Sequence, residues 1–272
     1  ASVAICGVAG KDRTWDDLAA ILTREGVDIA SVTSCSQRQT THKMRLSSRG
    51  LPLARLDFEA SEPIGPDLEE ALLGSVYGAV SAGVDGIVLS DYAKGVCTPR
   101  VCRSVIRMAR QFGMPVVVDP KDGSFAKYRG ATSLCPNLDE FNGVMHGDES
   151  VPEMRAARMV RELEIDFLVV TMGSGGVFLS DGDEVERFPA RAQTVCDVAG
   201  AGDTVAAVMA LGLASGWSFR EAVVLANVAA GVVVGKPGAA TLTVEELQEA
   251  LTDGSDEIGR SWVDASNRFV GR

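Results

Sequence analysis

The sequence of 272 residues predicts a doubly wound α/β fold, with a mostly parallel central sheet, helices on both of its faces and a small β-hairpin lid. Short apolar runs such as Ile87–Leu89 and Val116–Val118 alternate with stretches of helical periodicity, as βαβ units require. These runs end in polar residues, which is typical of strands whose carboxyl ends border a ligand site. Two-residue alternation between Val32 and Phe58 predicts the hairpin.

The remaining elements follow from the same two periodicities, taken along the chain. Apolar runs predict strands at 2–8, 87–89, 116–118, 132–135, 167–171, 177–179 and 184–188. Helical spacing predicts helices that begin near residue 14 and after residue 137, and helices at 66–82, 99–112, 152–163, 219–234 and 243–251. We expect one domain over residues 1–272, with a lid insertion at 32–58 and a polar tail at 253–272.

Composition narrows the class of protein. A hydrophobic content of 46% supplies a core, and a net charge of −11 argues against a nucleic-acid partner. The longest nearly apolar stretch, Ala222–Val234, is interrupted by Asn227 and is too short to cross a membrane. The six cysteines show no metal-ligand spacing, so we expect reduced thiols in a cytoplasmic protein.

Residues 197–207 read DVAGAGDTVAA and predict a glycine-rich loop that opens a helix. The first turn of a helix has unpaired N–H groups and the positive end of the helix dipole, and the small residues Gly200, Ala201 and Gly202 let an anion approach them closely. A carboxylate repels a phosphate bound beside it. Its presence here is explained if it accepts a proton from the group that attacks the phosphate. Asp203 is therefore a candidate base for phosphoryl transfer to a hydroxyl. The alternative is an ordinary helix N-cap.

Polar residues at four strand ends should converge beside Asp203, namely Ser90-Asp91, Asp119-Lys121, Asn137-Glu140 and Thr171-Gly173. Asn137 and Glu140 suit Mg²⁺ held through water, because that ion keeps much of its hydration shell; the alternative is a capped helix N-terminus. Lys94 and Lys121 offer positive charge to a phosphate, or are solvated surface lysines.

Two further polar features have less distinctive surroundings. Asn227 lies in an otherwise apolar helix, where its amide needs a partner, either a neighbouring loop or the edge of an adenine. His42 and His146 lie apart from any triad context, so we expect neither to act in hydrolysis.

The motifs PNLDE, TMGSGG and DVAGAGDTVAA follow one another in this order along the chain and resemble signatures of the ribokinase-type (PfkB) carbohydrate kinases, which have them in the same order. Finer segments resemble the D-glycero-β-D-manno-heptose 7-phosphate kinases of the ADP-heptose pathway. These segments are LSDYAKG, VVVDPK, KYRGATSLCPNLDEF, HKMRLSSRGLPLARLDFE and AAGVVVGKPG. The resemblance extends to about Leu251 and implies a ribokinase-like fold.

The resemblance implies transfer of the ATP γ-phosphoryl group to the anomeric hydroxyl of heptose 7-phosphate, giving the 1,7-bisphosphate. Asp203 would be the base, and the backbone of Gly200, Ala201 and Gly202 the anion hole. The implied nucleotide and metal residues are Asn137 and Glu140 for Mg²⁺, Asp197 for a monovalent cation such as K⁺, and Lys121, Thr171, Gly173, Gly176 and Asn227 for ATP. The implied residues for the sugar phosphate are Lys43, Arg45, Arg55, Asp91 and Lys94.

Two departures from the family pattern keep other functions open. Ala199 stands where the family usually has Thr or Ser, which removes a hydroxyl and keeps the backbone. The opening strand with a sugar-binding Asp and the Gly-Gly-Ala-x-Asn segment have no counterpart, so we expect part of the sugar site to be lacking. The alternatives are a kinase for another sugar or sugar phosphate, or a catalytically weak nucleotide-binding or scaffold protein. The hairpin edges predict a homodimer.

Overall fold

The structure is a computed structural model that describes residues 1–48, 51–121, 123–144, 151–191 and 194–253. His146 and the predicted tail from residue 254 onward lie outside the described residues. Among the described residues, no helix combines the length and the apolar character needed to cross a bilayer.

A six-stranded sheet forms the centre of the molecule, and its strands lie in the order β10-β9-β8-β7-β6-β5. Neighbours from β5 to β8 pair in parallel, whereas β9 and β10 are antiparallel to the strands beside them. The strands are β5 (Ile87–Ser90), β6 (Val116–Asp119), β7 (Ser133–Leu134), β8 (Phe167–Thr171), β9 (Val177–Ser180) and β10 (Val185–Phe188). The predicted mostly parallel sheet is confirmed, although β7 is shorter than expected.

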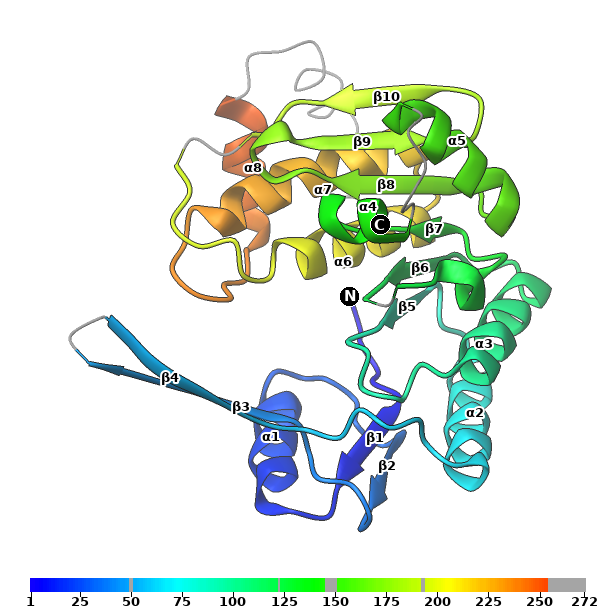
Figure 1. The fold of residues 1–272 in the computed structure, drawn as a ribbon, viewed down its shortest axis with the longest axis vertical. Coiled ribbons are helices and arrows are strands. Elements are labelled where there is room, and N and C mark those ends of the chain that lie inside the picture. The colour runs from blue at the N-terminus through cyan, green and yellow to red at the C-terminus, as the bar shows by residue number, and fades with distance from the viewer. Residues whose placement is uncertain (49–50, 122, 145–150, 192–193, 254–272) are drawn as a thin grey trace.

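Helices cover both faces of this sheet, as Figure 1 shows, and the buried residues form two separate clusters. The elements that pack on one face are α2 (Pro66–Ser81), α3 (Pro99–Gln111), α4 (Leu138–Val144), α5 (Pro152–Leu163) and the 3₁₀ turn η1 (Phe125–Tyr128). The helices on the other face are α6 (Ala201–Ala214), α7 (Phe219–Val234) and α8 (Val244–Asp253). The predicted doubly wound arrangement is therefore confirmed.

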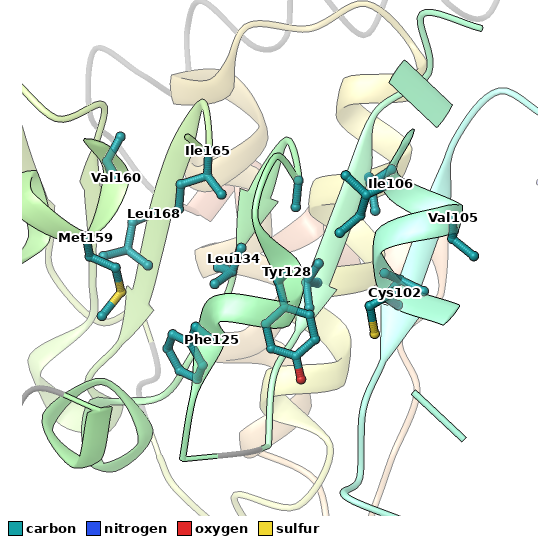
Figure 2. Packing of buried hydrophobic residues seen from close by; sticks show 14 of the residues in the cluster. Cys102, Val105, Ile106, Phe125, Tyr128, Leu134, Met159, Val160, Ile165 and Leu168 are labelled. Atoms are coloured by element: carbon teal, nitrogen blue, oxygen red, sulfur yellow. The ribbon is translucent and has the colours of Figure 1, made fainter. Parts of the chain in front are cut away.

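The first cluster fixes η1 against the sheet (Figure 2). Phe125 and Tyr128 are almost fully buried, and in the view of Figure 2 Tyr128 lies between Leu134 of β7 and Cys102 of α3. Because aromatic side chains bury large areas, this packing holds the loop after β6 firmly. The phenol oxygen of Tyr128 lies at the edge of the cluster and is used at the functional site described below.

The N-terminal part forms a second, two-stranded sheet, and Val8 of this sheet packs against the first core cluster. Strand β1 (Gly7–Gly10) pairs in parallel with β2 (Val32–Cys35), and α1 (Arg13–Arg24) lies between them in the chain. The prediction of a buried strand at 2–8 was wrong in its bounds, and β1 lies outside the central sheet. No residue of helix α1 is fully buried, and Ile21 on this helix is 47% exposed.

The hairpin consists of β3 (His42–Ser48) and β4 (Leu51–Phe58), and it projects from the rest of the molecule (Figure 1). The prediction that the hairpin begins at Val32 was wrong, because residues 32–35 pair with β1 instead. Two-residue alternation is the same in either sheet, so the pattern could not assign β2 to its partner. Residues 49–50 of the predicted turn lie outside the described residues.

Candidate active site

A cavity of about 180 Å³ opens at the carboxyl ends of the parallel strands, beside the first turn of α6. Its lining residues are Asp91, Tyr92, Asp119, Lys121, Cys135, Asn137, Glu140, Thr171, Gly202 and Asp203. The predicted strand-end residues Asp91, Lys121, Asn137, Glu140 and Thr171 are thus brought together with the GAGD loop. This location follows from topology, because the parallel strands β5 to β8 all end at the same edge of the sheet.

The GAGD loop opens α6 in the predicted way. Gly200 is the N-cap residue and has a φ of +83°, a left-handed conformation that favours glycine. Since glycine has no side chain to cap the helix, the first-turn amides of Gly202 and Asp203 have neither an intrahelical carbonyl nor a cap from Gly200. The amide of Ala201 donates to Val198 O at 3.3 Å, so Gly202 offers the more open amide. A Cβ at Gly202 would meet no atom within 4 Å, which leaves room for an anion.

Asp203 lies in this first turn with its carboxylate exposed at the cavity. Its Oδ1 accepts a hydrogen bond of 2.7 Å from the hydroxyl of Tyr92, which is the second residue after β5. Partial burial of the phenol and the Asp203 carboxylate together raise the pKa of Tyr92, so Tyr92 is protonated and acts as the donor. Asp203 therefore faces the cavity, where a hydroxyl could approach it.

The cavity carries an excess of negative charge. Burial, followed by the charges of Asp203 and Glu140, raises the pKa of Asp119 from 3.8 to about 7. The ammonium of Lys121 opposes this shift and is itself held 2.7 Å from Glu140 Oε1. Carboxylates thus exceed ammonium groups around this part of the cavity, which favours a bound cation.

Asn137 and Glu140 cap the N-terminus of α4 reciprocally. The amide of Glu140 donates to Asn137 Oδ1, and the amide of Asn137 donates to Glu140 Oε2, each at 2.9 Å. This is the capping alternative that the sequence left open, although both residues also line the cavity. In the part of the chain that the structure describes, no group of three His, Cys, Asp or Glu residues could hold a metal ion. The oxygens present fit Mg²⁺ bound largely through water and phosphate, with few direct protein ligands.

Asp91 was expected to contact the sugar, but both of its carboxylate oxygens contact other groups of the protein. Its Oδ1 accepts from the amide of Ala93, and its Oδ2 accepts from Tyr128 Oη and lies next to Lys127 Nζ, all at 2.7 Å. The residue is 4% exposed. Because both carboxylate oxygens already have protein partners, these contacts favour a structural role for Asp91 over direct binding of a sugar.

The lysine and arginine residues expected to bind a sugar phosphate lie outside the cavity lining. Lys94 Nζ is 2.6 Å from Glu59 Oε1, and Lys43 Nζ is 2.8 Å from Glu59 Oε2, so one carboxylate holds both ammonium groups. Arg55 pairs with Asp57 at 2.6 Å. Arg45 stands opposite Arg55 in the hairpin register and is exposed. The structure therefore groups these cations around the hairpin rather than around Asp203.

Of the residues expected to bind the nucleotide, some lie at the cavity or in open space, and others contact the protein closely. Thr171 lines the cavity, and Gly173 has a φ of +56° with open space around it. Gly176, in contrast, has a φ of +83°, and a Cβ there would lie 2.0 Å from Phe188 O, so close packing against the chain after β10 requires this glycine. Asn227 is buried, and its amide donates to Pro189 O at 2.8 Å, which is the neighbouring-loop partner that the sequence offered beside an adenine.

Asp197 lies beside the C-terminal end of α7, where the resemblance places a monovalent cation. The amides of Cys196 and Asp197 both donate to Val234 O, at 2.7 and 3.1 Å. Asp197 Oδ1 accepts from the amide of Ala199 at 2.9 Å. The two segments are therefore neighbours, and the carboxylate and nearby carbonyl groups offer the oxygen atoms that such an ion needs.

Three residues that line the cavity, namely Tyr92, Asp119 and Cys135, were not assigned a role from the sequence. Asp119 was recognised only as a polar strand end, and its perturbed pKa depends on carboxylates from α4 and α6. Tyr92 stands next to Asp91 in LSDYAKG, yet an exposed tyrosine carries no signal of a contact 111 residues away. The one sequence signal available was its position directly after a predicted strand, at the edge where ligands bind.

A family model and known proteins agree with this fold. The family model "pfkB family carbohydrate kinase" matches residues 1–246, and the chain belongs to this family. The chain is 40% identical over 254 residues to the Bifunctional protein HldE of Wolinella succinogenes, a match that covers 92% of this chain and 53% of that protein. It is 43% identical over 250 residues to the Bifunctional protein HldE of Azotobacter vinelandii, covering 91% and 51%. The chain thus spans about half the length of these relatives.

Solved structures confirm the ribokinase-like fold. Phosphofructokinase-2 from Escherichia coli, solved in complex with potassium, matches with a TM-score of 0.77 at 18% identity, covering 92% of this chain and 81% of that one. Ribokinase from Thermotoga maritima matches with a TM-score of 0.72 at 22% identity, with the same coverage. Family membership and fold together confirm the predicted class, a carbohydrate kinase that transfers a phosphoryl group to an alcohol.

Proposed function

We propose that this chain transfers the γ-phosphoryl group of ATP to the anomeric hydroxyl of D-glycero-β-D-manno-heptose 7-phosphate, producing the 1,7-bisphosphate. One observation carries the proposal. An exposed carboxylate, Asp203, and an open helix N-terminus at Gly202 border the same cavity at the carboxyl ends of the parallel strands. This pairs a proton acceptor with a phosphate-binding site, as phosphoryl transfer to a hydroxyl requires.

In the proposed reaction, Asp203 accepts the proton of the sugar hydroxyl as that oxygen attacks the γ-phosphorus, the bond from this phosphorus to the bridging oxygen of the β-phosphate breaks, and ADP leaves. The amides at the start of α6 hold the transferring group by hydrogen bonds that a helix N-terminus is suited to make. Lys121, which borders the same cavity, supplies positive charge to the phosphate oxygens. Thr171 and Gly173, at the end of β8, are the residues we assign to the nucleotide.

Two cations fit the residues present. Glu140 and Asn137 would hold Mg²⁺ through water, and the excess of carboxylates around Asp119 favours such an ion. Mg²⁺, when bound, would neutralise phosphate charge during transfer. Asp197 and the carbonyl groups around the end of α7 would hold a monovalent cation such as K⁺, the ion named in the solved phosphofructokinase-2 complex.

The heptose phosphate is proposed as the acceptor because of the segments LSDYAKG and HKMRLSSRGLPLARLDFE. The second segment is the hairpin, whose charged face carries Lys43, Arg45 and Arg55. In an acidic chain these cations would serve a substrate that already bears a phosphate, once the sugar phosphate competes for the ion pairs with Glu59 and Asp57.

The hairpin also supports a homodimer. Met44 stands opposite Leu56 and His42 opposite Phe58, so these side chains share one face of the hairpin. Leu56 is 44% exposed and Phe58 is 45% exposed. A two-stranded hairpin is marginally stable alone in water, and the same face of a second copy would cover this apolar surface. We therefore propose a dimer formed face to face through β3 and β4.

Six free cysteines are consistent with a cytoplasmic enzyme.

The experiment that tests the function is ATP consumption with a panel of sugar phosphates, with the product identified by mass spectrometry and NMR. We expect heptose 7-phosphate to give the highest kcat/KM and the new phosphate to be on the anomeric oxygen. Turnover with another sugar phosphate only would select the alternative acceptor. ATP binding with no turnover on any acceptor would select the weak nucleotide-binding or scaffold function and overturn the proposal.

A further inference from the structure

We propose that Tyr92 is a positioning residue for Asp203, and that the loop 91–95 is built to hold its hydroxyl against Oδ1 of that carboxylate. The inference rests on the proposed function, because it takes Asp203 as the group that accepts the proton. Neither the sequence motifs nor the similar proteins point to the hydrogen bond between Tyr92 and Asp203. The hydrogen bond measures 2.7 Å and joins the end of β5 to the start of α6.

The loop is fixed on its inner side by Asp91. The buried Asp91 carboxylate bonds Tyr128 Oη and lies beside Lys127 Nζ, and both of these residues belong to η1. Tyr128 is fully buried in the core cluster of Figure 2. The backbone amide of Asp91 also donates to Asp119 O, which continues the sheet by one residue. The residue before Tyr92 is thus immobilised by both core packing and charge.

The other end of the loop is fixed equally well. The carbonyl of Lys94 accepts from Arg38 at 2.6 Å, and the carbonyl of Gly95 accepts from the amide of Ile64 at 2.9 Å. Gly95 has a φ of +74°, and a Cβ there would lie 1.9 Å from Glu62 O. Close contact with the backbone of Glu62 therefore requires glycine at this position.

Between these anchors, Ala93 adopts a φ of +54°, a left-handed conformation that a residue with a Cβ rarely takes. Its amide is held by Asp91 Oδ1, which stabilises the turn. Strained backbone persists only where the surroundings enforce it, and such residues gather at functional sites. The result of the turn is that the Tyr92 side chain, although 53% exposed, reaches across to Asp203.

Both partners of this hydrogen bond lie at the surface of the cavity, where water can replace either of them in the folded chain, so the contact is better explained by what it does to the carboxylate. A donor on Oδ1 fixes the rotation of the Asp203 side chain and leaves Oδ2 free to receive the proton of an attacking hydroxyl. A positioned base is more effective than a freely rotating one, because its geometry needs no reorganisation during the reaction.

The test compares Tyr92→Phe with the wild-type chain and with Tyr77→Phe, a control at an exposed tyrosine of α2. We expect Tyr92→Phe to lower kcat roughly tenfold, since a hydrogen bond to a charged group is lost, with little change in the KM for ATP. The other charged groups at the cavity, Asp91, Asp119, Lys121 and Glu140, are the same in both chains.

A double variant separates positioning from contact with the sugar. If Tyr92 acts through Asp203, Tyr92→Phe should have no further effect on kcat in the Asp203→Asn background. A loss of equal size in both backgrounds, or a Tyr92→Phe enzyme within about twofold of wild type at every pH, would overturn the inference. An Asp203→Asn chain that retains full turnover would instead contradict the proposed function.

A measurement that needs no turnover tests the contact itself. The chain contains three tyrosines, so ¹³Cζ-tyrosine labelling gives few NMR signals, and Tyr92→Phe assigns the one of interest. We expect Asp203→Ala to move the Tyr92 resonance and to leave that of Tyr77 in place. A Tyr92 signal unchanged by Asp203→Ala would show that the hydrogen bond is not formed in solution, and the inference would be wrong.

Discussion

The ammonium of Lys121 lies 2.7 Å from Oε1 of Glu140, while Oε2 of the same carboxylate caps the amide of Asn137. Glu140 therefore joins the end of β6 to the first turn of α4 at the edge of the cavity. It is also the residue through which we expect Mg²⁺ to be held by water, so its charge can be tested separately from its capping bond.

Glu140→Gln keeps an oxygen that can cap the helix and removes the negative charge. We expect the Mg²⁺ concentration for half-maximal rate to rise about tenfold or more at fixed ATP, because the water shell of the ion loses a charged acceptor. The measurement is the rate as a function of MgCl₂. Glu70→Gln, at an exposed position of α2, should behave as wild type. An unchanged Mg²⁺ dependence in Glu140→Gln would remove Glu140 from the metal site.

Asp119 should make folding stability depend on pH. Its pKa rises from 3.8 to about 7 on folding, so the folded chain holds this proton over a pH range in which the unfolded chain has lost it. Stability contributed by this group is therefore lost as pH increases from about 4 to 7. Asp119→Asn removes the effect, and we expect its stability relative to wild type to improve by about 1–3 kcal/mol between pH 5 and pH 8.

Urea unfolding of both chains at the two pH values measures this difference. Asp85→Asn, at an exposed carboxylate, is the matched control and should show no such pH dependence. If the stability difference between Asp119→Asn and wild type were the same at pH 5 and pH 8, the Asp119 carboxyl would not be perturbed in the way the structure indicates.

The dimer proposal predicts opposite results for two leucines of one strand. Leu56 stands opposite Met44, whereas Leu53 falls at the register shift of the hairpin and stands opposite no residue of β3. We expect Leu56→Lys to convert the dimer to a monomer at micromolar concentration, since it places a charge in the apolar contact. Leu53→Lys should leave the dimer intact. Sedimentation velocity distinguishes the two, and a monomeric wild-type chain or equal effects of both substitutions would contradict the proposed face.

Much of the fold follows from sequence periodicity, because apolar runs and helical spacing are local signals. The bounds of α5 and α7 were predicted to the residue, and the polar strand ends meet at one edge as parallel pairing requires. Strand β2 was assigned to the hairpin because alternation shows that a segment is a strand and does not show its partner. The correct pairing with β1 depends on contacts distant in the chain.

The site was predictable where a motif imposes a backbone shape, as at Gly200, and less so where side chains choose between partners. Asn227 required a hydrogen-bond partner, and the sequence could not distinguish Pro189 O from an adenine. Lys94 was expected to bind a phosphate, whereas in the structure its ammonium pairs with Glu59. This ion pair forms only when the base of the hairpin meets the loop after β5. Such choices depend on tertiary geometry that composition and spacing do not encode.

The most direct test of the central claim is the rate of Asp203→Asn with ATP and heptose 7-phosphate, measured alongside Asp67→Asn as a control at an exposed carboxylate of α2. If Asp203 accepts the proton of the attacking hydroxyl, kcat should fall by roughly 10²–10⁴-fold while ATP still binds. Asp67→Asn should turn over as wild type does. An Asp203→Asn enzyme whose kcat lies within a few-fold of wild type would contradict the account.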